Sequence, residues 1–161
     1  MKNKMTEKLF ELAYTDSMTE VQNRNAYEER LKKLRKPNAN ISRITVIVVD
    51  VNGLKEINDS YGHFCGDDAI KTVAKALRDT IGLKADIYRI GGDECVCISE
   101  SNVLPYISQF KDTIYFINNE KLYNLSVSID YSRFHEKYSK SIDDIICRAD
   151  EKMYKDKKSK K

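Results

Sequence analysis

The chain has 161 residues, of which 41% are hydrophobic and 33% charged, with 6 glycines and 2 prolines. This length suits one domain with a sizeable core, and the composition excludes collagen-like, low-complexity and mostly disordered chains. Residues 155–161 hold five lysines and one aspartate and so carry a charge of +4. The whole chain has a net charge of +3, so residues 1–154 carry −1. A body so close to neutrality gives no compositional case for nucleic-acid binding, and a basic tail alone is typical of a solvated chain end.

The sequence gives no sign of membrane contact. No apolar run approaches the roughly 20 residues of a membrane span, and the first residues, MKNKMTEKLFEL, are too charged for a signal peptide. The cysteines form no C-x-x-C pair, and His63 and His135 do not complete a zinc pattern. We therefore expect a cytoplasmic chain with reduced thiols, which a longer parent protein could still anchor to a membrane.

The first predicted elements are two helices and a strand. Apolar residues at helical spacing predict a helix over 3–14 and another after Asn23, separated by the turn DSMTEVQN. Pro37 breaks this pattern. The β-branched run ITVIVVDV, residues 44–51, then predicts a fully buried central strand that carries Asp50 near its end.

A helix and a hairpin follow. One apolar stripe predicts a helix over 66–82, with Asp67 near its start and a glycine where it would end. Two short strands, 87–90 and another through Val96, flank the dipeptide Gly91-Gly92. Because glycine tolerates positive φ, this arrangement predicts a hairpin.

The remaining pattern predicts a helix over 103–117, a strand over 125–129 and a last helix over 142–153. Ser141 and Asp144 resemble a capping box at the start of that last helix. The order of strands and helices predicts an α+β fold in which helices flank one mainly antiparallel sheet. The ferredoxin-like palm is the nearest common architecture.

Three carboxylates stand at predicted strand ends. Asp50 lies near the end of the buried strand, and Asp93 and Glu94 follow the glycines of the hairpin. Carboxylate oxygens suit Mg²⁺, which is usually held by one or two carboxylates together with substrate phosphates. Spacing alone leaves open a plainer interpretation, in which these acids are ordinary turn and strand-end residues.

The wider pattern resembles the GGDEF family of diguanylate cyclases. The segments that carry the resemblance are DSMTEVQNRNAY, DVNGLKEINDSYGHFCGD, YRIGGDE, SVSI and ADEKMYKDK, spanning residues 16–161. The resemblance implies that two GTP condense into cyclic di-GMP with loss of two pyrophosphates, each 3′-hydroxyl attacking the other α-phosphate. It implies Mg²⁺, with Mn²⁺ as the alternative, and a homodimer in which each copy holds one GTP. We therefore expect the polyanion that this chain binds to be GTP and not nucleic acid.

The same resemblance assigns roles to residues. It implies a metal site of Asp50, Asp93 and the Val51 carbonyl, with Asp93 and Glu94 as the catalytic acids. It implies contacts to the nucleotide from Lys55, Asn58, Asp67, Gly91, Gly92, Lys157 and Lys161, the last of which replaces the family's usual arginine. Asn58 and Asp67 would read guanine, since a carboxylate accepts from its N1 and N2 hydrogens. Each also has a plainer interpretation, a helix C-cap for Asn58 and an N-cap for Asp67.

Several positions depart from the family. Cys95 replaces the phenylalanine of the signature, and a truncated phenylalanine costs about 3–5 kcal/mol unless neighbours fill the space. Glu20 replaces a glycine, which is unfavourable if that position needs positive φ. The family's inhibitory Arg-x-x-Asp site is missing, because Gly82 and Ala85 stand there, and Asn52 replaces an aspartate that does not bind metal.

We expect a connecting helix in residues 1–15 and the GGDEF domain in residues 16–161. Two other functions remain open from the sequence. One is a catalytically silent module that binds GTP or cyclic di-GMP and regulates a partner. The other is a structural dimerisation domain, against which the retained Asn58, Asp67, Asp50 and Asp93 argue.

Overall fold

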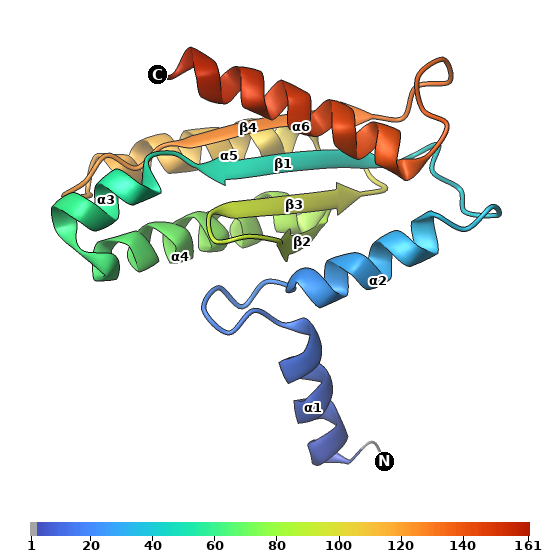
Figure 1. The fold of residues 1–161 in the computed structure, drawn as a ribbon, viewed down its shortest axis with the longest axis horizontal. Helices are drawn as coiled ribbons and strands as arrows, with labels where there is room; N and C mark the ends of the chain where they lie inside the picture. The colour runs from blue at the N-terminus through green and yellow to red at the C-terminus, as the bar shows by residue number, and fades with distance from the viewer. Residues whose placement is uncertain (1–2) are drawn as a thin grey trace.

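The centre of the computed structural model, which describes residues 3–161, is one four-stranded sheet (Figure 1). Its strands are β1 (Thr45–Val51), β2 (Asp86–Arg89), β3 (Glu94–Ser99) and β4 (Val127–Arg133). They lie in the order β2-β3-β1-β4, and every neighbouring pair is antiparallel. The central position of β1 follows from its sequence, because a continuous β-branched run can be buried on both faces.

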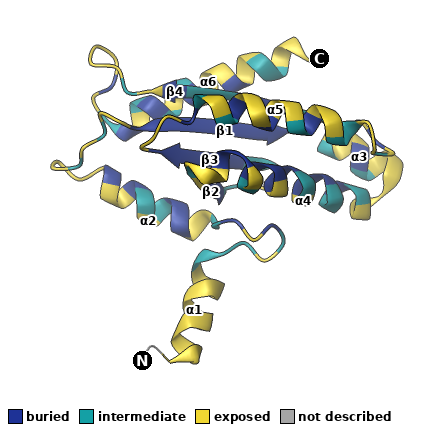
Figure 2. Cartoon of the chain, turned by 180° about the vertical axis from the view of Figure 1, so that it is seen from behind, coloured by how far each residue is buried: buried dark blue, intermediate teal, exposed yellow. Residues whose placement is uncertain are grey.

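Four of the six α-helices of residues 3–161 cover the two faces of this sheet. The six are α1 (Lys4–Tyr14), α2 (Arg24–Leu34), α3 (Leu54–Tyr61), α4 (His63–Asp79), α5 (Leu104–Asn118) and α6 (Ile142–Ser159). Helices α4 and α5 lie against one face, and α2 and α6 lie against the other (Figures 1 and 2). This arrangement confirms the predicted α+β fold of the ferredoxin-like palm type.

Strand β1 divides the core between the two faces. Val46 and Val48 pack with α2 and α6, while Ile47 and Val49 pack with α4 and α5. The alternation follows from the two-residue period of a strand, and all four side chains are at most 1% exposed. Asp50 is therefore directed to the same face as Val48, toward α6.

The helices around residue 60 differ from the prediction. Helix α3 was not predicted, and α4 begins at His63 and ends at Asp79 instead of spanning 66–82. Both helices start after a glycine in a backbone conformation that other residues rarely adopt, with φ of 63° at Gly53 and 87° at Gly62. Among the glycines of residues 3–161, these two have positive φ and the two in the hairpin do not.

The predicted capping box of the last helix is confirmed. Ser141 accepts a bond from the backbone of Asp144, and the Asp144 carboxylate accepts one from the backbone of Ser141.

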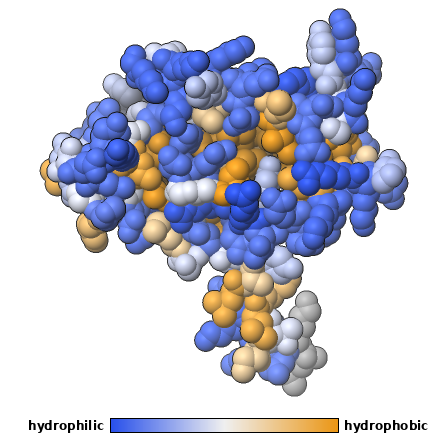
Figure 3. Space-filling model, viewed as in Figure 1, coloured by the Kyte–Doolittle hydropathy of each residue, from blue (hydrophilic) through white to orange (hydrophobic). Residues whose placement is uncertain are grey.

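The first helix, α1, projects away from the sheet, and none of its residues is buried (Figure 1). Its apolar side chains lie on the surface, where Figure 3 shows them as a hydrophobic patch. Within residues 3–161, no helix is long and apolar enough to cross a membrane.

Candidate active site

The end of β1 and the turn of the β2-β3 hairpin lie side by side. Asp50 pairs with Glu94 in the antiparallel register, and the Val51 N–H donates to the Asp93 carbonyl oxygen at 2.9 Å. Two segments more than 40 positions apart thereby bring their acids to one edge of the sheet.

Asp50 is the most buried acid of this group, with 7% of its surface exposed. Its Oδ2 atom accepts a bond from the Lys157 ammonium at 2.6 Å. Its Oδ1 atom is buried and has no hydrogen-bond partner within the described part of the chain. Burial raises the pKa of Asp50, a shift that Lys157 opposes and the nearby Asp93 carboxylate reinforces. Burial and the carboxylate of Asp150 also raise the pKa of Glu94.

A buried carboxylate oxygen without a partner is an unsatisfied group that a cation can satisfy. Asp50, Asp93 and the Val51 carbonyl together offer oxygen ligands, the kind that Mg²⁺ prefers. Among residues 3–161, no three acids, cysteines or histidines gather closely enough to hold a metal ion by themselves. An ion held by so few protein ligands would be completed by phosphate oxygens and water.

The hairpin turn is held by arginines. Arg89 donates to the Asp16 carboxylate at 3.1 Å and to the Gly92 carbonyl oxygen at 2.9 Å, and Arg24 donates to the Ile90 carbonyl oxygen at 3.2 Å. Asp16 also accepts bonds from the backbone and hydroxyl of Thr19. Arg89 thus bridges the turn between α1 and α2 and the turn that carries Asp93.

Gly91 and Gly92 lie in the predicted hairpin turn, but without the positive φ expected of them. Neither has positive φ, so the conformational argument for the two glycines was wrong. Both are exposed, and a Cβ atom at Gly92 would meet no atom within 4 Å. The glycines therefore leave open space above the turn instead of relieving backbone strain.

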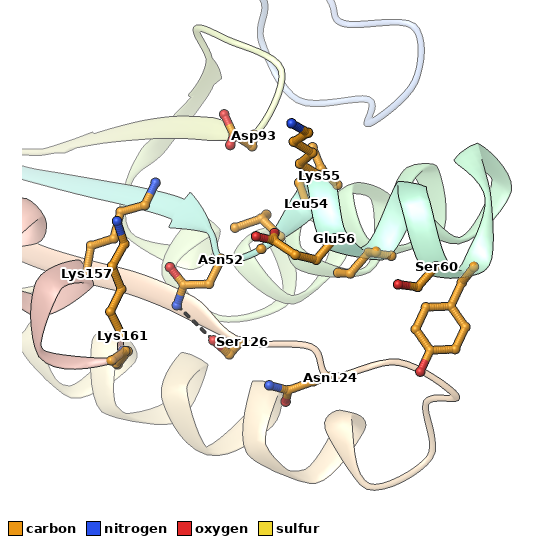
Figure 4. A pocket seen from close by; sticks show the side chains of 15 residues that line it. Asn52, Leu54, Lys55, Glu56, Ser60, Asp93, Asn124, Ser126, Lys157 and Lys161 are labelled. Atoms are coloured by element: carbon orange, nitrogen blue, oxygen red, sulfur yellow. Dashed lines mark hydrogen bonds between the residues drawn. The ribbon is translucent and has the colours of Figure 1, made fainter.

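A cavity of about 600 Å³ lies beside these strand ends (Figure 4). Lys55 enters its wall from α3 and Asp93 from the hairpin, while Lys157 and Lys161 reach it from the end of α6. Lys160, which the sequence analysis did not single out, also lines the cavity and donates to the Val127 carbonyl oxygen at 2.7 Å. The cavity is thus lined by the carboxylates of Asp93 and Glu56 and by four lysine ammonium groups, a set of charges that suits a polyanion together with its bound cation.

Asn52 closes the floor of the cavity. Its amide donates to Ser126 Oγ at 2.8 Å and accepts from Ser128 Oγ at 2.7 Å, which joins β1 to β4. Figure 4 shows the first of these bonds. Asn52 therefore has a structural role in this chain.

Asn58 and Asp67 lie on neighbouring helices outside the cavity wall. Asn58 lies within α3 and Asp67 within α4, so neither is a helix cap, and both plainer interpretations are excluded. The Asn58 amide lies against the backbone of Gly66, where a Cβ atom would collide with it. Gly66 thus allows the close approach of α3 and α4 that places Asn58 beside the residue preceding Asp67.

The structure shows the surroundings of Cys95 and Glu20, two of the positions at which the sequence differs from the pattern it resembles. Cys95 is 8% exposed and packs in the core on the α4 side, where burial raises the pKa of its thiol to about 12. Glu20 has φ of 62°, so the position does need the conformation that glycine favours. Its carboxylate pairs with Arg78 at 2.7 Å, which ties the α1-α2 turn to α4.

The chain resembles known proteins over nearly its whole length. The GGDEF family, described as "Diguanylate cyclase, GGDEF domain", matches residues 13–161. The chain is 31% identical over 153 residues to the probable diguanylate cyclase DgcI of Escherichia coli (strain K12), covering 94% of this chain and 33% of that protein. It is 30% identical over 171 residues to a diguanylate cyclase of Vibrio cholerae serotype O1, covering 96% of this chain and 50% of that protein. The chain thus spans a third to a half of the length of these relatives.

Its fold is also similar to solved structures. The coiled coil and GGDEF domain of DgcB from Caulobacter crescentus, solved in complex with c-di-GMP, matches with a TM-score of 0.80 and 21% identity. The match covers 97% of this chain and 86% of that one. At this identity the likeness concerns the fold, which agrees with the antiparallel palm described above.

Proposed function

The chain belongs to the GGDEF family of diguanylate cyclase domains, and on that premise we propose that it condenses two GTP into cyclic di-GMP. The observation that carries the proposal is the buried, unpartnered Oδ1 of Asp50 beside Asp93, at the edge of a cavity lined by lysines. This combination of a cation site and a phosphate site suits a nucleoside triphosphate. The relatives named diguanylate cyclase and the related fold solved with c-di-GMP support the same substrate and product.

In the proposed reaction, the 3′-hydroxyl oxygen of each GTP forms a bond to the α-phosphorus of the other. The bond from that phosphorus to the oxygen bridging the α- and β-phosphates breaks, and pyrophosphate leaves. Asp50, Asp93 and the Val51 carbonyl would hold Mg²⁺ or Mn²⁺, which supplies charge neutralisation at the phosphates. Asp93 or Glu94, the two carboxylates at the turn of the hairpin, would accept the single proton of the attacking hydroxyl.

The other residues would bind the substrate. Lys55, Lys157 and Lys161 would contact the phosphates from two sides of the cavity, and Gly92 leaves room for the nucleotide at the turn. The Asp67 carboxylate would accept hydrogen bonds from the guanine edge, and the Asn58 amide would both donate and accept there. Each domain would hold one GTP, so two copies must face each other for the reaction to occur.

The experiment that tests this proposal is product analysis with GTP and Mg²⁺, in a chain fused to a two-stranded coiled coil that enforces the dimer. We expect cyclic di-GMP from the unsubstituted sequence and none from Asp93→Asn. Asp59→Asn, which changes an exposed acid of α3, should retain activity. Parallel reactions with Mn²⁺ identify the metal that is used.

A catalytically silent GTP-binding module is the second candidate. The strained Glu20 and the small Cys95 favour it, because both lie in or behind the turns that hold the catalytic acids. GTP binding in calorimetry without any product from the enforced dimer would support this second function. The absence of both binding and product would contradict both candidates.

A further inference from the structure

The α5-β4 loop holds the helix that carries Asp67 through one buried tyrosine. Tyr123 is 5% exposed, and its hydroxyl donates to Asp68 Oδ2 at 2.5 Å. The Lys121 ammonium donates to the same oxygen at 2.6 Å. Asp68 directly follows Asp67 in the first turns of α4, so the loop contacts the helix next to the proposed base-reading residue.

The same loop also contacts the neighbouring helix. The ring of Tyr123 lies against the ring of Tyr61 at the end of α3, with their centroids 6.3 Å apart. Lys121 additionally donates to Thr72 Oγ1 at 3.1 Å, one turn further along α4. Tyr123 therefore contacts both helices of the pair that carries Asn58 and Asp67.

The bonds around Asp68 hold it as a carboxylate. Burial by itself raises the pKa of Asp68, but the bonds from Lys121 and Tyr123 outweigh it and lower the pKa. Burial and the Asp68 carboxylate in turn raise the pKa of the Tyr123 hydroxyl, which therefore stays a donor. The direction of the bond is fixed, with tyrosine donating and aspartate accepting.

We infer that Tyr123 is a positioning residue for base recognition, which holds the first turns of α4 in place through Asp68. Successive residues of a helix point about 100° apart, so fixing the Asp68 side chain also fixes the direction of Asp67. This inference rests on the proposed function, in which Asp67 and Asn58 read guanine. The ligand class that it concerns is a purine nucleotide with a 2-amino group.

A site built to bond a substrate group rejects the analogue that lacks it. ITP differs from GTP only by the absence of the 2-amino group, so the ratio of the two affinities reports on that contact. Loss of the Tyr123 hydroxyl would misplace Asp67 and weaken GTP binding more than ITP binding. A purely structural role would change both affinities equally.

The test measures dissociation constants for GTP and ITP by calorimetry, with Ca²⁺ in place of Mg²⁺ to suppress turnover. We expect a preference for GTP of at least about tenfold in the unsubstituted chain, and a loss of at least about fivefold of that preference in Tyr123→Phe. Asp68→Asn should show a similar loss. Tyr106→Phe, which removes a hydroxyl from a half-buried tyrosine of α5, should leave the preference unchanged.

A Tyr123→Phe variant that unfolds at lower temperature but keeps the full preference for GTP overturns the inference, as does an unchanged preference in Asp68→Asn. Equal affinity of the unsubstituted chain for GTP and ITP overturns the base-reading assignment as well. A failure of the base-reading assignment is seen already in the unsubstituted chain, whereas a failure of the inference about Tyr123 is seen only in the variants. The two results are therefore distinguishable.

Discussion

The Lys157 ammonium donates to Oδ2 of Asp50 at 2.6 Å, so the last helix places a positive charge on the carboxylate of the central strand. The Asp50 side chain is 10% exposed and that of Lys157 is 31% exposed. In the absence of a metal ion, this ammonium is the cation that balances the buried acid. The same lysine also lines the cavity.

We predict that Lys157→Met destabilises the metal-free protein by about 1–3 kcal/mol, because a buried carboxylate then lacks its charged partner. Mg²⁺ should reduce this difference, since it can neutralise the same carboxylate. Urea unfolding with and without Mg²⁺ measures both effects. Lys155→Met, an exposed site on the same helix, serves as the control, and equal destabilisation of the two variants would contradict the prediction.

Gly66→Ala should weaken nucleotide binding without unfolding the protein. A Cβ atom there collides with the end of the Asn58 side chain, which can rotate away. The free energy of unfolding should change by less than about 1 kcal/mol, because alanine favours the helix. The dissociation constant for GTP should rise about tenfold. Combining Gly66→Ala with Asn58→Ala should add little to Asn58→Ala alone, whereas additive losses would show that the two sites act independently.

Gly92→Ala should separate activity from stability at the hairpin turn. The position is open and its φ is not positive, so the stability should stay within about 0.5 kcal/mol of the unsubstituted value. Cyclic di-GMP formation should fall at least about tenfold, because the added methyl group occupies the space proposed for the nucleotide. Thermal unfolding and product analysis measure the two quantities, and an unchanged rate would place the nucleotide elsewhere.

Glu20→Gly should stabilise the fold by about 0.5–1 kcal/mol. Left-handed backbone costs a residue with a side chain about 1–2 kcal/mol, and the exposed pair with Arg78 returns less than about 1 kcal/mol. Glu20→Gln, which keeps the strain and removes the charge, should be slightly less stable than the unsubstituted chain. A destabilised Glu20→Gly variant would mean that the contact with Arg78 outweighs the strain.

The bond between Asp16 and Arg89 should give stability that depends on pH. Burial raises the pKa of Asp16, but the bonds from Thr19 and Arg89 outweigh it and hold the pKa below the ordinary value of 3.8. The stabilisation is therefore complete above pH 3.8 and is lost as the pH falls through the lower, folded-state pKa. Asp16→Asn should cost about 1–2 kcal/mol at pH 7 and progressively less in acid.

Urea unfolding between pH 7 and pH 2.5 checks this dependence. The exposed substitution Asp112→Asn provides the matched control, and its effect should not vary across the same range. A deficit of Asp16→Asn that stays constant down to pH 2.5 would show that the carboxylate charge does not stabilise the turn.

Local patterns in the sequence were enough to predict the sheet, most of the helices and the acids at the strand ends. The run from residue 44 to 51 indicates a buried strand by composition, and the capping box at Ser141 needs only four neighbouring residues. Helix α3 could not be predicted in the same way. Its start depends on the left-handed backbone of Gly53, which the sequence pattern did not reveal.

The sequence by itself determined which residues carry charge and chemistry, because side-chain type and strand periodicity are local properties. Only the tertiary structure decided which of them meet. Lys157 and Asp50 are 107 positions apart, and Tyr123 and Asp68 are 55 apart. Such pairs form because the sheet order and the packing of α4 and α6 bring distant segments together, which no local pattern encodes. The same packing turns the basic chain end into part of the cavity wall.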